Sequence, residues 1–470
     1  GARIWYSAVE GEAKSMATLM DMTMEELLAP EGYACSCGRT HRAGLLMLKI
    51  GSGALRFLPE ALKLLQCKKP FVFCDENTYK AAGYRVEAAL KQANAPFALF
   101  QFPQAHVEPD EHAVAQLAAA MDADCDLILS VGSGVITDCG KVLAQQKGLR
   151  QLAVATAPSM DGYASNSSSM IYHRVKVSAY NACPQVILAD TDVLKTAPDR
   201  MLRAGLGDML AKSIALCEWR ISHIVTGEYY CAEIAGLMRK SLNKIVDAAP
   251  KLLARDEQAL EAVAEGLVLS GLAMAFAEVS RPASGLEHYF SHLWEMFALL
   301  GGETPELHGL QVGVGTALTL KILERLQTMR PDAQTMAQSV AAFNEAAWER
   351  DVRRVFGVVA DELIEKEKTL WHKNDLNARR ERFKRIEEHW DEILAIMAQE
   401  LPGADETIAL MLSLGLPTTP GEVGATPQQA RDAFLHSRDI RDKYLTSSML
   451  WDMGLLDEFA QDELLGISPK

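Results

Sequence analysis

Short apolar runs alternate with helical stretches from about residue 45 to residue 190. Alternation of this kind is typical of a parallel sheet with helices on both faces. We therefore predict an α/β, doubly wound, Rossmann-like domain at the N-terminal end. Its expected strands lie at residues 45–50, 71–74, 97–102, 126–131, 152–156 and 186–189.

The pattern changes near residue 200, where apolar residues begin to recur at the three-four spacing of amphipathic helices. The clearest of these helical stretches are residues 206–222, 228–246, 260–277, 311–326 and 382–400. The second half of the chain is therefore predicted to be all-helical. We place the domain boundary at residue 200, which gives an α/β domain over 1–200 and a helical domain over 201–470.

Composition excludes some classes of protein but does not identify a function. The chain has 470 residues, 49% of them hydrophobic, which is enough for two cores. Its net charge of -15 argues against nucleic acid or an anionic membrane as the main partner. We find no apolar run long enough to span a bilayer and no signal core in the first residues, so we expect a cytoplasmic protein. Nine cysteines, an odd number, do not suggest a disulfide framework.

Cys35, Cys37 and His41 lie close together in the sequence and are possible metal ligands. A structural zinc site needs a fourth ligand, and the neighbouring sequence offers none. The favoured interpretation is therefore a loop or strand edge with incidental thiols, and a structural metal is the alternative.

A glycine turn follows the strand expected at 126–131 and leads into a helix. Gly132 and Gly134 flank Ser133 there, so backbone amides and a helix N-terminus could receive a pyrophosphate. A plain tight turn is the alternative, because the full dinucleotide fingerprint is missing. Asp75 ends the strand at 71–74, where it could contact a ribose hydroxyl or simply cap the next helix.

Two histidines four residues apart, His288 and His292, share one face of an expected helix, and His308 follows sixteen residues later. Upstream, Asp208 lies just past a Gly-x-Gly turn. Three imidazoles could meet at one point, and one aspartate with two histidines would leave an open position on a metal, as catalytic sites do. Solvated or core histidines on an ordinary helix are the alternative.

Five motifs in order, GSGVITD, TAPSMDGYAS, AGLGDMLAK, SRPASGLEHYFSH and LHGLQVGVGT, resemble those of the bacterial sn-glycerol-1-phosphate dehydrogenases. That family belongs to the superfamily of iron-type alcohol dehydrogenases, glycerol dehydrogenase and 3-dehydroquinate synthase. The resemblance covers roughly residues 35–320 and implies a dehydroquinate synthase-like fold. One departure is a segment at about 350–405 that is longer than expected, which leaves substrate preference and oligomer packing open.

The resemblance implies roles for individual residues. It makes Asp208, His288 and His308 the metal ligands, so that His292 serves the substrate and its proton transfer instead. Asp161 matches an acid that contacts the substrate. The expected cofactor contacts are Asp75, Gly134, Val135, Ile136, Thr137, Asp138, Thr156, Ser159 and Ser165.

The activity implied is reduction of dihydroxyacetone phosphate to sn-glycerol 1-phosphate, as used in phospholipid biosynthesis. The cofactors would be NADH or NADPH and one divalent ion, zinc or nickel, and the chain would form a homo-oligomer. Arg281 is our first choice for the cation that binds the substrate phosphate, with Lys212 and Arg174 as rivals. Alternatives are a glycerol dehydrogenase or other polyol oxidoreductase, a dehydroquinate synthase-like lyase, and a binding protein without chemistry.

Overall fold

A computed structural model describes residues 18–173 and 175–467 of the chain. By internal contacts these residues form two compact units. The first, the sheet unit, comprises 18–209 and 231–282, and the second, the helical unit, comprises 210–230 and 283–467. The division of roles between residues 1–200 and 201–470 stays a prediction, and each unit is described by itself below.

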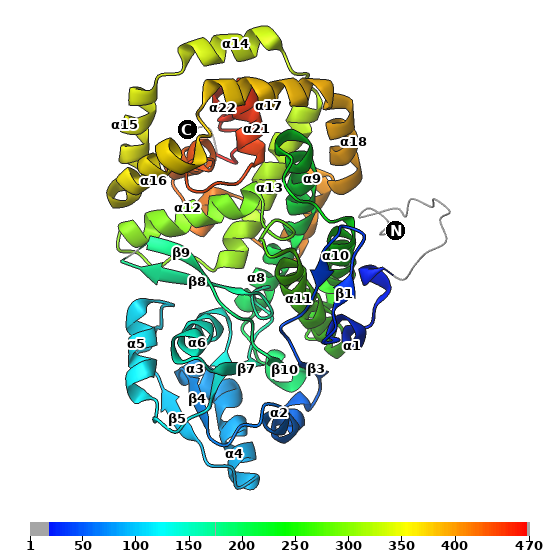
Figure 1. The fold of residues 1–470 in the computed structure, drawn as a ribbon, viewed down its shortest axis with the longest axis vertical. Helices are drawn as coiled ribbons and strands as arrows, with labels where there is room; N and C mark the ends of the chain where they lie inside the picture. Colours follow the sequence, from blue (N-terminus) through cyan, green and yellow to red (C-terminus); the bar gives the residue numbers. More distant parts are fainter. Residues whose placement is uncertain (1–17, 174, 468–470) are drawn as a thin grey trace. The chain divides into compact units, whose positions relative to one another are not determined.

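The sheet unit contains a six-stranded parallel sheet (Figure 1), which confirms the predicted fold class. The strand order is β3-β10-β7-β6-β4-β5. All six strands correspond to apolar runs in the sequence. They are β3 (Met47–Gly51), β4 (Pro70–Cys74), β5 (Ala98–Gln101), β6 (Leu127–Gly132), β7 (Arg150–Ala155) and β10 (Val186–Asp190).

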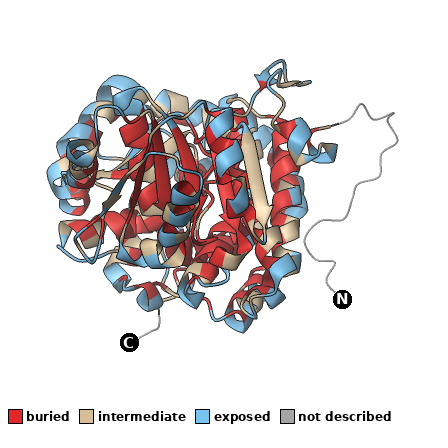
Figure 2. Cartoon of the chain, turned by 90° about the horizontal axis from the view of Figure 1, so that it is seen from below, coloured by how far each residue is buried: buried red, intermediate tan, exposed pale blue. Residues whose placement is uncertain are grey.

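Helices cover both faces of this sheet. Side chains alternate between the two faces along each strand, so a single strand contributes to the core on each side. In β4, Val72 and Cys74 join a core cluster with α2 (Leu58–Leu64) and α4 (Tyr84–Gln92). Phe71 and Phe73 point to the other face, where α5 (Glu111–Ala120) and α6 (Gly134–Lys147) pack. Figure 2 shows the buried strands in red and the outer surfaces of many helices in blue.

The order of the strands reverses between β4 and β6. From β4 the chain moves outward to β5, then returns to the other side of β4 as β6 and continues to β7 and β10. In open α/β sheets, ligands bind beyond the carboxyl ends of the strands at such a point. Asp75 follows β4 and the Gly132–Gly134 turn ends β6, so both lie at the carboxyl edge where the order reverses.

Two small antiparallel pairs were not predicted. They are β1 (Tyr33–Ala34) with β2 (Thr40–His41), and β8 (Ser167–Tyr172) with β9 (Val175–Tyr180). The run Ser167-Ser168-Ser169 has no apolar alternation, while Met170 of β8 is buried in the core cluster beneath α6 and Tyr172 packs against it. Local pattern gave no signal for β8, whereas the alternation of Val175, Val177 and Ala179 in β9 was a signal that the prediction did not use. Arg174 lies outside the described residues.

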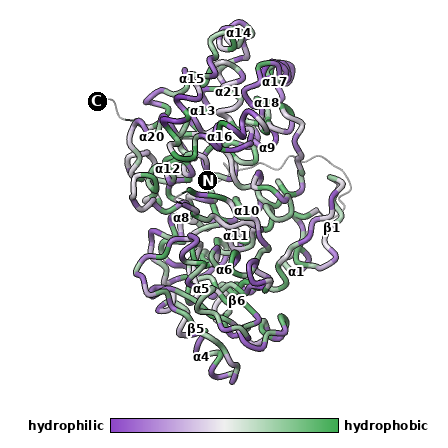
Figure 3. The backbone as a smooth tube through the Cα atoms, turned by 60° about the vertical axis from the view of Figure 1, so that its left-hand side comes forward, coloured by the Kyte–Doolittle hydropathy of each residue, from purple (hydrophilic) through white to green (hydrophobic). Residues whose placement is uncertain are grey.

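Two long helices that follow the predicted boundary belong to the sheet unit by contacts. These are α10 (Ala232–Leu252) and α11 (Glu257–Ala277), which pack on each other, and α11 also contacts β3. The prediction that no apolar run could span a bilayer needs correction, because α11 has the length and hydropathy to do so (Figure 3). However, 72% of its most apolar window is buried, as expected for a core helix.

The helical unit confirms the all-helical prediction for the described second half of the chain. Two predicted helices are each divided in two: residues 206–222 break near Ala211, and residues 382–400 break at His389. Outside the helical unit, the described residues also form α1 (Met24–Leu27), α3 (Glu76–Thr78), α7 (Thr191–Leu194) and α8 (Asp199–Leu210), whose last residue is the first of the helical unit. The helical unit has α9 (Lys212–Thr226), α12 (Leu286–Leu300), α13 (His308–Gln327), α14 (Ala333–Ala342), α15 (Glu345–Phe356), α16 (Ala360–Lys366), α17 (Leu376–Glu388), α18 (Trp390–Glu400), α19 (Ala404–Ser413), α20 (Pro427–His436), α21 (Thr446–Met453) and α22 (Leu456–Phe459).

One ion cluster in the helical unit joins α15 to α20. His436 Nδ1 lies 2.8 Å from Asp439 Oδ2, and its Nε2 lies 2.8 Å from Asp351 Oδ2. Burial by itself lowers the pKa of His436, but the two carboxylate hydrogen bonds outweigh burial and raise it to about 9. Since the folded pKa exceeds the ordinary value of 6.5, the charged imidazole stabilises the fold below pH 6.5, and this stabilisation is lost as the pH rises through 9.

His436→Gln is therefore expected to destabilise the protein at pH 6 and to cost much less at pH 9.5. The pKa shift corresponds to a loss on the order of 3 kcal/mol at the lower pH. Urea midpoints of both proteins at the two pH values measure this difference. His389→Gln is the matched control, because His389 makes a similar bond to Glu392 on the surface, where such pairs contribute little. An equal loss at both pH values would contradict the prediction.

Candidate active site

The glycine turn after β6 forms the N-terminus of α6. Ser133 is the residue before the helix and Gly134 its first residue. A Cβ at Gly134 would lie 3.4 Å from Met160 Cγ, which is ordinary van der Waals contact, and without one the backbone at this end of the helix carries no side chain that could obstruct a ligand. The buried Thr137 hydroxyl has no hydrogen-bond partner among the described residues. A helix N-terminus with an unused buried hydroxyl fits a phosphate-bearing ligand.

The other predicted cofactor residues on α6, and Asp75, make packing contacts or hydrogen bonds within the protein. Val135 and Ile136 pack against the core cluster beneath α6, and Asp138 Oδ2 accepts a hydrogen bond of 3.0 Å from Ser169 N–H. Asp75 caps α3, since its Oδ1 accepts from Thr78 N–H at 2.8 Å. The capping alternative for Asp75 is thus observed, and its contact with a ribose stays a prediction.

The segment after β7 carries the residues predicted to contact the nicotinamide. Thr156 N–H donates to the Gly132 carbonyl at 3.1 Å, which ties this segment to the glycine turn. Thr156, Ser159 and Ser165 are all buried. The structure therefore places them on one segment beside the turn, as small polar side chains that a flat ring can approach.

Lys141 holds the same segment and was missed by the sequence analysis. It is buried on α6, and its ammonium group donates to Ser165 Oγ at 3.1 Å and to the Ser167 carbonyl at 3.0 Å. Burial lowers its pKa. A lysine inside a helix gives no local signal of such a role, because lysines are common on helix surfaces. Lys141 positions the Gly162–Ser167 segment and is not itself predicted to touch the cofactor.

Asp208, His288 and His308 form a group in which each residue offers one ligand atom, and these atoms lie within 4.8 Å of one another. Asp208 is on α8, His288 on α12, and His308 is the first residue of α13. These are the residues that the resemblance proposed as metal ligands. An aspartate with two histidines is a donor set that suits a divalent transition metal and leaves coordination positions open.

Neighbouring groups fix which ring nitrogen of each histidine can bind a metal. His288 Nδ1 lies 2.9 Å from Glu287 Oε1, and His308 Nδ1 lies 3.3 Å from Glu295 Oε1. A carboxylate only accepts, so each Nδ1 carries the proton and each Nε2 keeps its lone pair. Carboxylates bonded to the far nitrogen of metal-binding histidines are a common feature of such sites. Neither Glu287 nor Glu295 was predicted from the sequence to have this role.

Ser291 completes this arrangement around His308. Its hydroxyl donates to Gln311 Oε1 at 2.9 Å, which leaves the hydroxyl oxygen to accept from His308 Nδ1 at 3.1 Å. The helices α12 and α13 also approach closely, because a Cβ at Gly315 would lie 2.3 Å from the Glu287 carbonyl oxygen. Only glycine permits that contact, so packing fixes the spacing of the helices that carry His288 and His308.

Asp161 supports Asp208 from the backbone. Asp161 N–H donates to Asp208 Oδ2 at 3.1 Å, and its own carboxylate accepts from Ser270 on α11 at 2.8 Å. His292 lies one turn after His288, with ring centroids 6.3 Å apart, and its ring is 6.0 Å from that of His308. His292 is thus near both rings, but the group whose ligand atoms lie within 4.8 Å of one another consists of Asp208, His288 and His308. The roles of Asp161 and His292 toward a substrate stay predictions.

Of the three cations predicted to be able to bind the substrate phosphate, the structure describes two, and both are buried. Arg281, before α12, is 3% exposed. Lys212 is fully buried at the start of α9 and donates to the Ala283 carbonyl at 3.1 Å. Arg174 lies outside the described residues. Which cation binds a phosphate stays a prediction.

Replacing Gly134 by leucine is expected to weaken NAD(P)H binding roughly tenfold or more, because the side chain would fill space at the helix N-terminus. The fold should survive, since Met160, the neighbour of the new Cβ, is a flexible side chain. Fluorescence titration of NADH measures the affinity and thermal unfolding measures the fold. Gly421→Leu is the control, because a Cβ there meets nothing within 4 Å. Unchanged affinity in the Gly134 variant would contradict the assignment of the loop.

Solved structures show the same fold. A probable glycerol dehydrogenase from Sinorhizobium meliloti aligns with a TM-score of 0.59 at 17% identity, over 89% of this chain and 99% of that one. An iron-containing alcohol dehydrogenase from Thermotoga maritima aligns with a TM-score of 0.57 at 12% identity, over 91% and 99%. In addition, residues 49–198 match the family model described as iron-containing alcohol dehydrogenase.

Curated relatives are more similar in sequence. A glycerol-1-phosphate dehydrogenase [NAD(P)+] from Halalkalibacterium halodurans is 32% identical over 320 residues, which cover 66% of this chain and 80% of the relative. The enzyme of that name from Bacillus licheniformis is 32% identical over 349 residues, covering 72% and 86%. The chain belongs to the iron-containing alcohol dehydrogenase superfamily, and it is an oxidoreductase. Within that superfamily, these relatives at about 30% identity are glycerol-1-phosphate dehydrogenases.

Proposed function

We propose that this enzyme reduces dihydroxyacetone phosphate to sn-glycerol 1-phosphate with NADH or NADPH and one divalent metal ion. The observation that carries the proposal is the group of Asp208, His288 and His308, found in a chain whose relatives carry the name glycerol-1-phosphate dehydrogenase. Their carboxylate and imidazole donors suit zinc, nickel or iron. The carboxylates Glu287 and Glu295 would orient the two rings.

The carboxyl edge of the sheet would hold the dinucleotide. The N-terminus of α6, from Gly134 to Asp138, would receive the pyrophosphate, and Asp75 would meet a ribose hydroxyl. Thr156, Ser159 and Ser165 would face the nicotinamide. The support for this assignment is the absence of a side chain at Gly134, the unused Thr137 hydroxyl, and the place of Asp75 and the glycine turn at the carboxyl edge where the strand order reverses.

When bound, the metal would supply electrostatic stabilisation of the negative charge that develops on the substrate oxygen, and the nicotinamide would supply the hydride. His292, one helical turn from His288, would supply or relay the proton that the product alcohol needs. Asp161 would orient a substrate hydroxyl, and Arg281 would bind the phosphate group. Substrate contact through Asp208 would be indirect, by way of the metal that it holds.

Steady-state oxidation of NADH and of NADPH with dihydroxyacetone phosphate tests the proposal. The protein is measured as purified, after chelation, and after return of zinc, nickel or iron. We expect activity that chelation abolishes and metal restores. Dihydroxyacetone and other small ketones serve as comparison substrates. Absence of dihydroxyacetone phosphate reduction in the reconstituted protein would overturn the proposal, and faster turnover of unphosphorylated polyols would instead indicate a glycerol dehydrogenase.

A homo-oligomeric state, a cytoplasmic location and a role in phospholipid biosynthesis accompany this proposal as predictions. Gel filtration with light scattering measures the first of them. A monomer would contradict it without affecting the proposed chemistry, because the ligands and the cofactor loop all come from one chain.

A further inference from the structure

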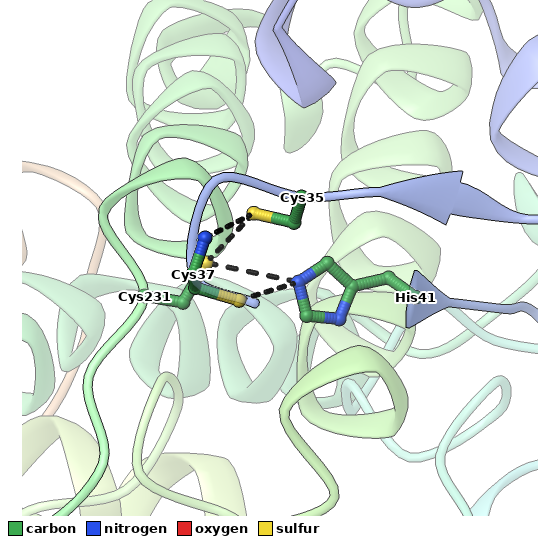
Figure 4. A group of neighbouring side chains, drawn as sticks. All are labelled: Cys35, Cys37, His41 and Cys231. Atoms are coloured by element: carbon green, nitrogen blue, oxygen red, sulfur yellow. Dashed lines mark hydrogen bonds between the residues drawn. The ribbon is translucent and has the colours of Figure 1, made fainter. Parts of the chain in front are cut away.

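Three thiols and an imidazole converge in the sheet unit, at a place that the proposed reaction does not use. Cys35, Cys37, His41 and Cys231 each offer one ligand atom, and these atoms all lie within 4.8 Å of one another (Figure 4). Cys35 Sγ lies 3.5 Å from Cys231 Sγ, and His41 Nε2 lies 3.4 Å from Cys37 Sγ and 3.7 Å from Cys231 Sγ. We call these four residues the thiol cluster.

A tight turn between β1 and β2 brings the first three residues together. Gly38 N–H donates to the Cys35 carbonyl at 3.0 Å, and Cys35 N–H donates to the Arg39 carbonyl at 2.9 Å. Gly38 has φ of 86°, in the left-handed region that favours glycine. Cys37 N–H also points toward Cys35 Sγ, at 3.5 Å. The turn therefore directs both thiols and the His41 ring to one side.

The fourth residue comes from a distant part of the sequence. Cys231 lies 190 residues after His41 and directly before the first residue of α10. A helix N-terminus favours negative charge, which makes this a suitable position for a thiolate. The expectation that no fourth ligand lies nearby was therefore wrong, because Cys231 is close in space although it is remote in sequence.

Three of the six distances between ligand atoms of the thiol cluster are close to those of a tetrahedral zinc site, and the other three lie within 4.8 Å. Zinc bonds of about 2.3 Å to sulfur and 2.0 to 2.1 Å to nitrogen imply edges of about 3.8 Å between two sulfurs and about 3.5 Å between sulfur and nitrogen. The observed separations of 3.5, 3.4 and 3.7 Å are close to these values. A disulfide would need about 2.05 Å between sulfurs, and all of these cysteines are free.

The orientation of His41 also suits a metal. Its Nδ1 lies 3.1 Å from the Phe276 carbonyl oxygen at the end of α11. A carbonyl only accepts, so Nδ1 carries the proton and Nε2 presents its lone pair to the three sulfurs. A backbone carbonyl bonded to the far nitrogen is a usual partner of a metal-binding histidine.

We propose that Cys35, Cys37, His41 and Cys231 bind one structural zinc ion, independently of the reaction proposed above. Three thiolates and one imidazole select zinc and close its coordination, whereas the Asp208 group keeps positions open. The ion would fasten the segment before β3 to the start of α10. That segment has little core of its own, because Leu19 and Leu27 are its buried apolar side chains over residues 18–44, all of which the structure describes.

The test compares metal content and cobalt spectra of the full-length protein and three variants. Cys37→Ser removes one ligand of the thiol cluster, and His288→Ala removes one ligand of the Asp208 group. Cys67→Ser is the matched control, because Cys67 is also partly exposed but lies outside the thiol cluster. Zinc per chain is measured after purification under reducing conditions. Cobalt substitution then reports sulfur ligands, because thiolate-to-cobalt charge transfer absorbs in the near ultraviolet.

We expect the Cys37 variant to hold about one zinc fewer per chain than the wild type and the Cys67 variant to hold the same amount. The cobalt charge-transfer band should appear in the wild type and in the His288 variant, since the Asp208 group has no sulfur. Absence of that band from the wild type, or an equal zinc content in the Cys37 variant and the wild type, would overturn the proposal. If the Cys37 variant fails to fold, the spectra of the wild type and the His288 variant still decide it.

Discussion

His288→Ala is expected to lose the metal of the Asp208 group and nearly all activity. The variant would keep two of three protein ligands, and the two carboxylates near the rings cannot replace an imidazole that is held by helix packing. We expect metal affinity to fall by orders of magnitude and kcat with it. Asp208→Ala and His308→Ala should behave alike. Metal analysis by mass spectrometry and steady-state assays measure both effects.

Because the thiol cluster is proposed to hold a zinc of its own, the comparison uses the difference in metal content between each variant and the wild type. His106→Ala is the control, since His106 is an exposed histidine outside both ligand groups. It should retain full metal and full activity. A complete complement of metal in any one of the three ligand variants would exclude that residue as a ligand.

Arg281→Ala is expected to reduce the preference for a phosphorylated substrate. A charge-assisted contact contributes about 1.5 to 3 kcal/mol, so dihydroxyacetone phosphate should exceed dihydroxyacetone by roughly one to two powers of ten in kcat/KM in the wild type. Loss of the guanidinium should narrow that gap, with little change for dihydroxyacetone. Arg281 is nearly inaccessible, at 3% exposure, so its charge would act on the phosphate without much competition from water.

Arg330→Ala provides the matched control, because Arg330 forms its ion pair with Asp391 on the surface of the helical unit. It should leave both substrates unchanged. A preserved gap in the Arg281 variant would rule out this choice of cation and direct attention to Lys212 and Arg174. Equal kcat/KM for the two ketones in the wild type would instead argue against a phosphate site altogether.

The sequence predicted the main sheet well because its strands are buried on both faces. Such strands form apolar runs, as in Phe71-Val72-Phe73-Cys74, which local pattern detects. β8 was not predicted because Ser167, Ser168 and Ser169 carry no alternation of apolar residues, although β9 does show such an alternation. The position of α10 and α11 in the sheet unit also could not be predicted, since helix packing depends on contacts between segments remote in the chain.

The residues of the candidate sites also differ in whether the sequence could predict them. The metal-ligand group was proposed from motifs that a family shares, and the structure brings Asp208, His288 and His308 together. Glu295 and Lys141 had no such motif, and their positions depend on the folded helices. Cys231 shows the limit most clearly. A zinc site completed from 190 residues away cannot be found by searching for ligands near His41.

The path of the chain constrains how this protein can be cut into fragments. The sheet unit takes residues from both sides of 210–230, so its two parts are contiguous in space but not in sequence. A recombinant fragment that ends at residue 200 would lack α10 and α11, and β3 would lose its contact with α11. An independent sheet unit would need residues 209 and 231 to be joined by a linker, and a fragment made without this joining should expose apolar surface and aggregate.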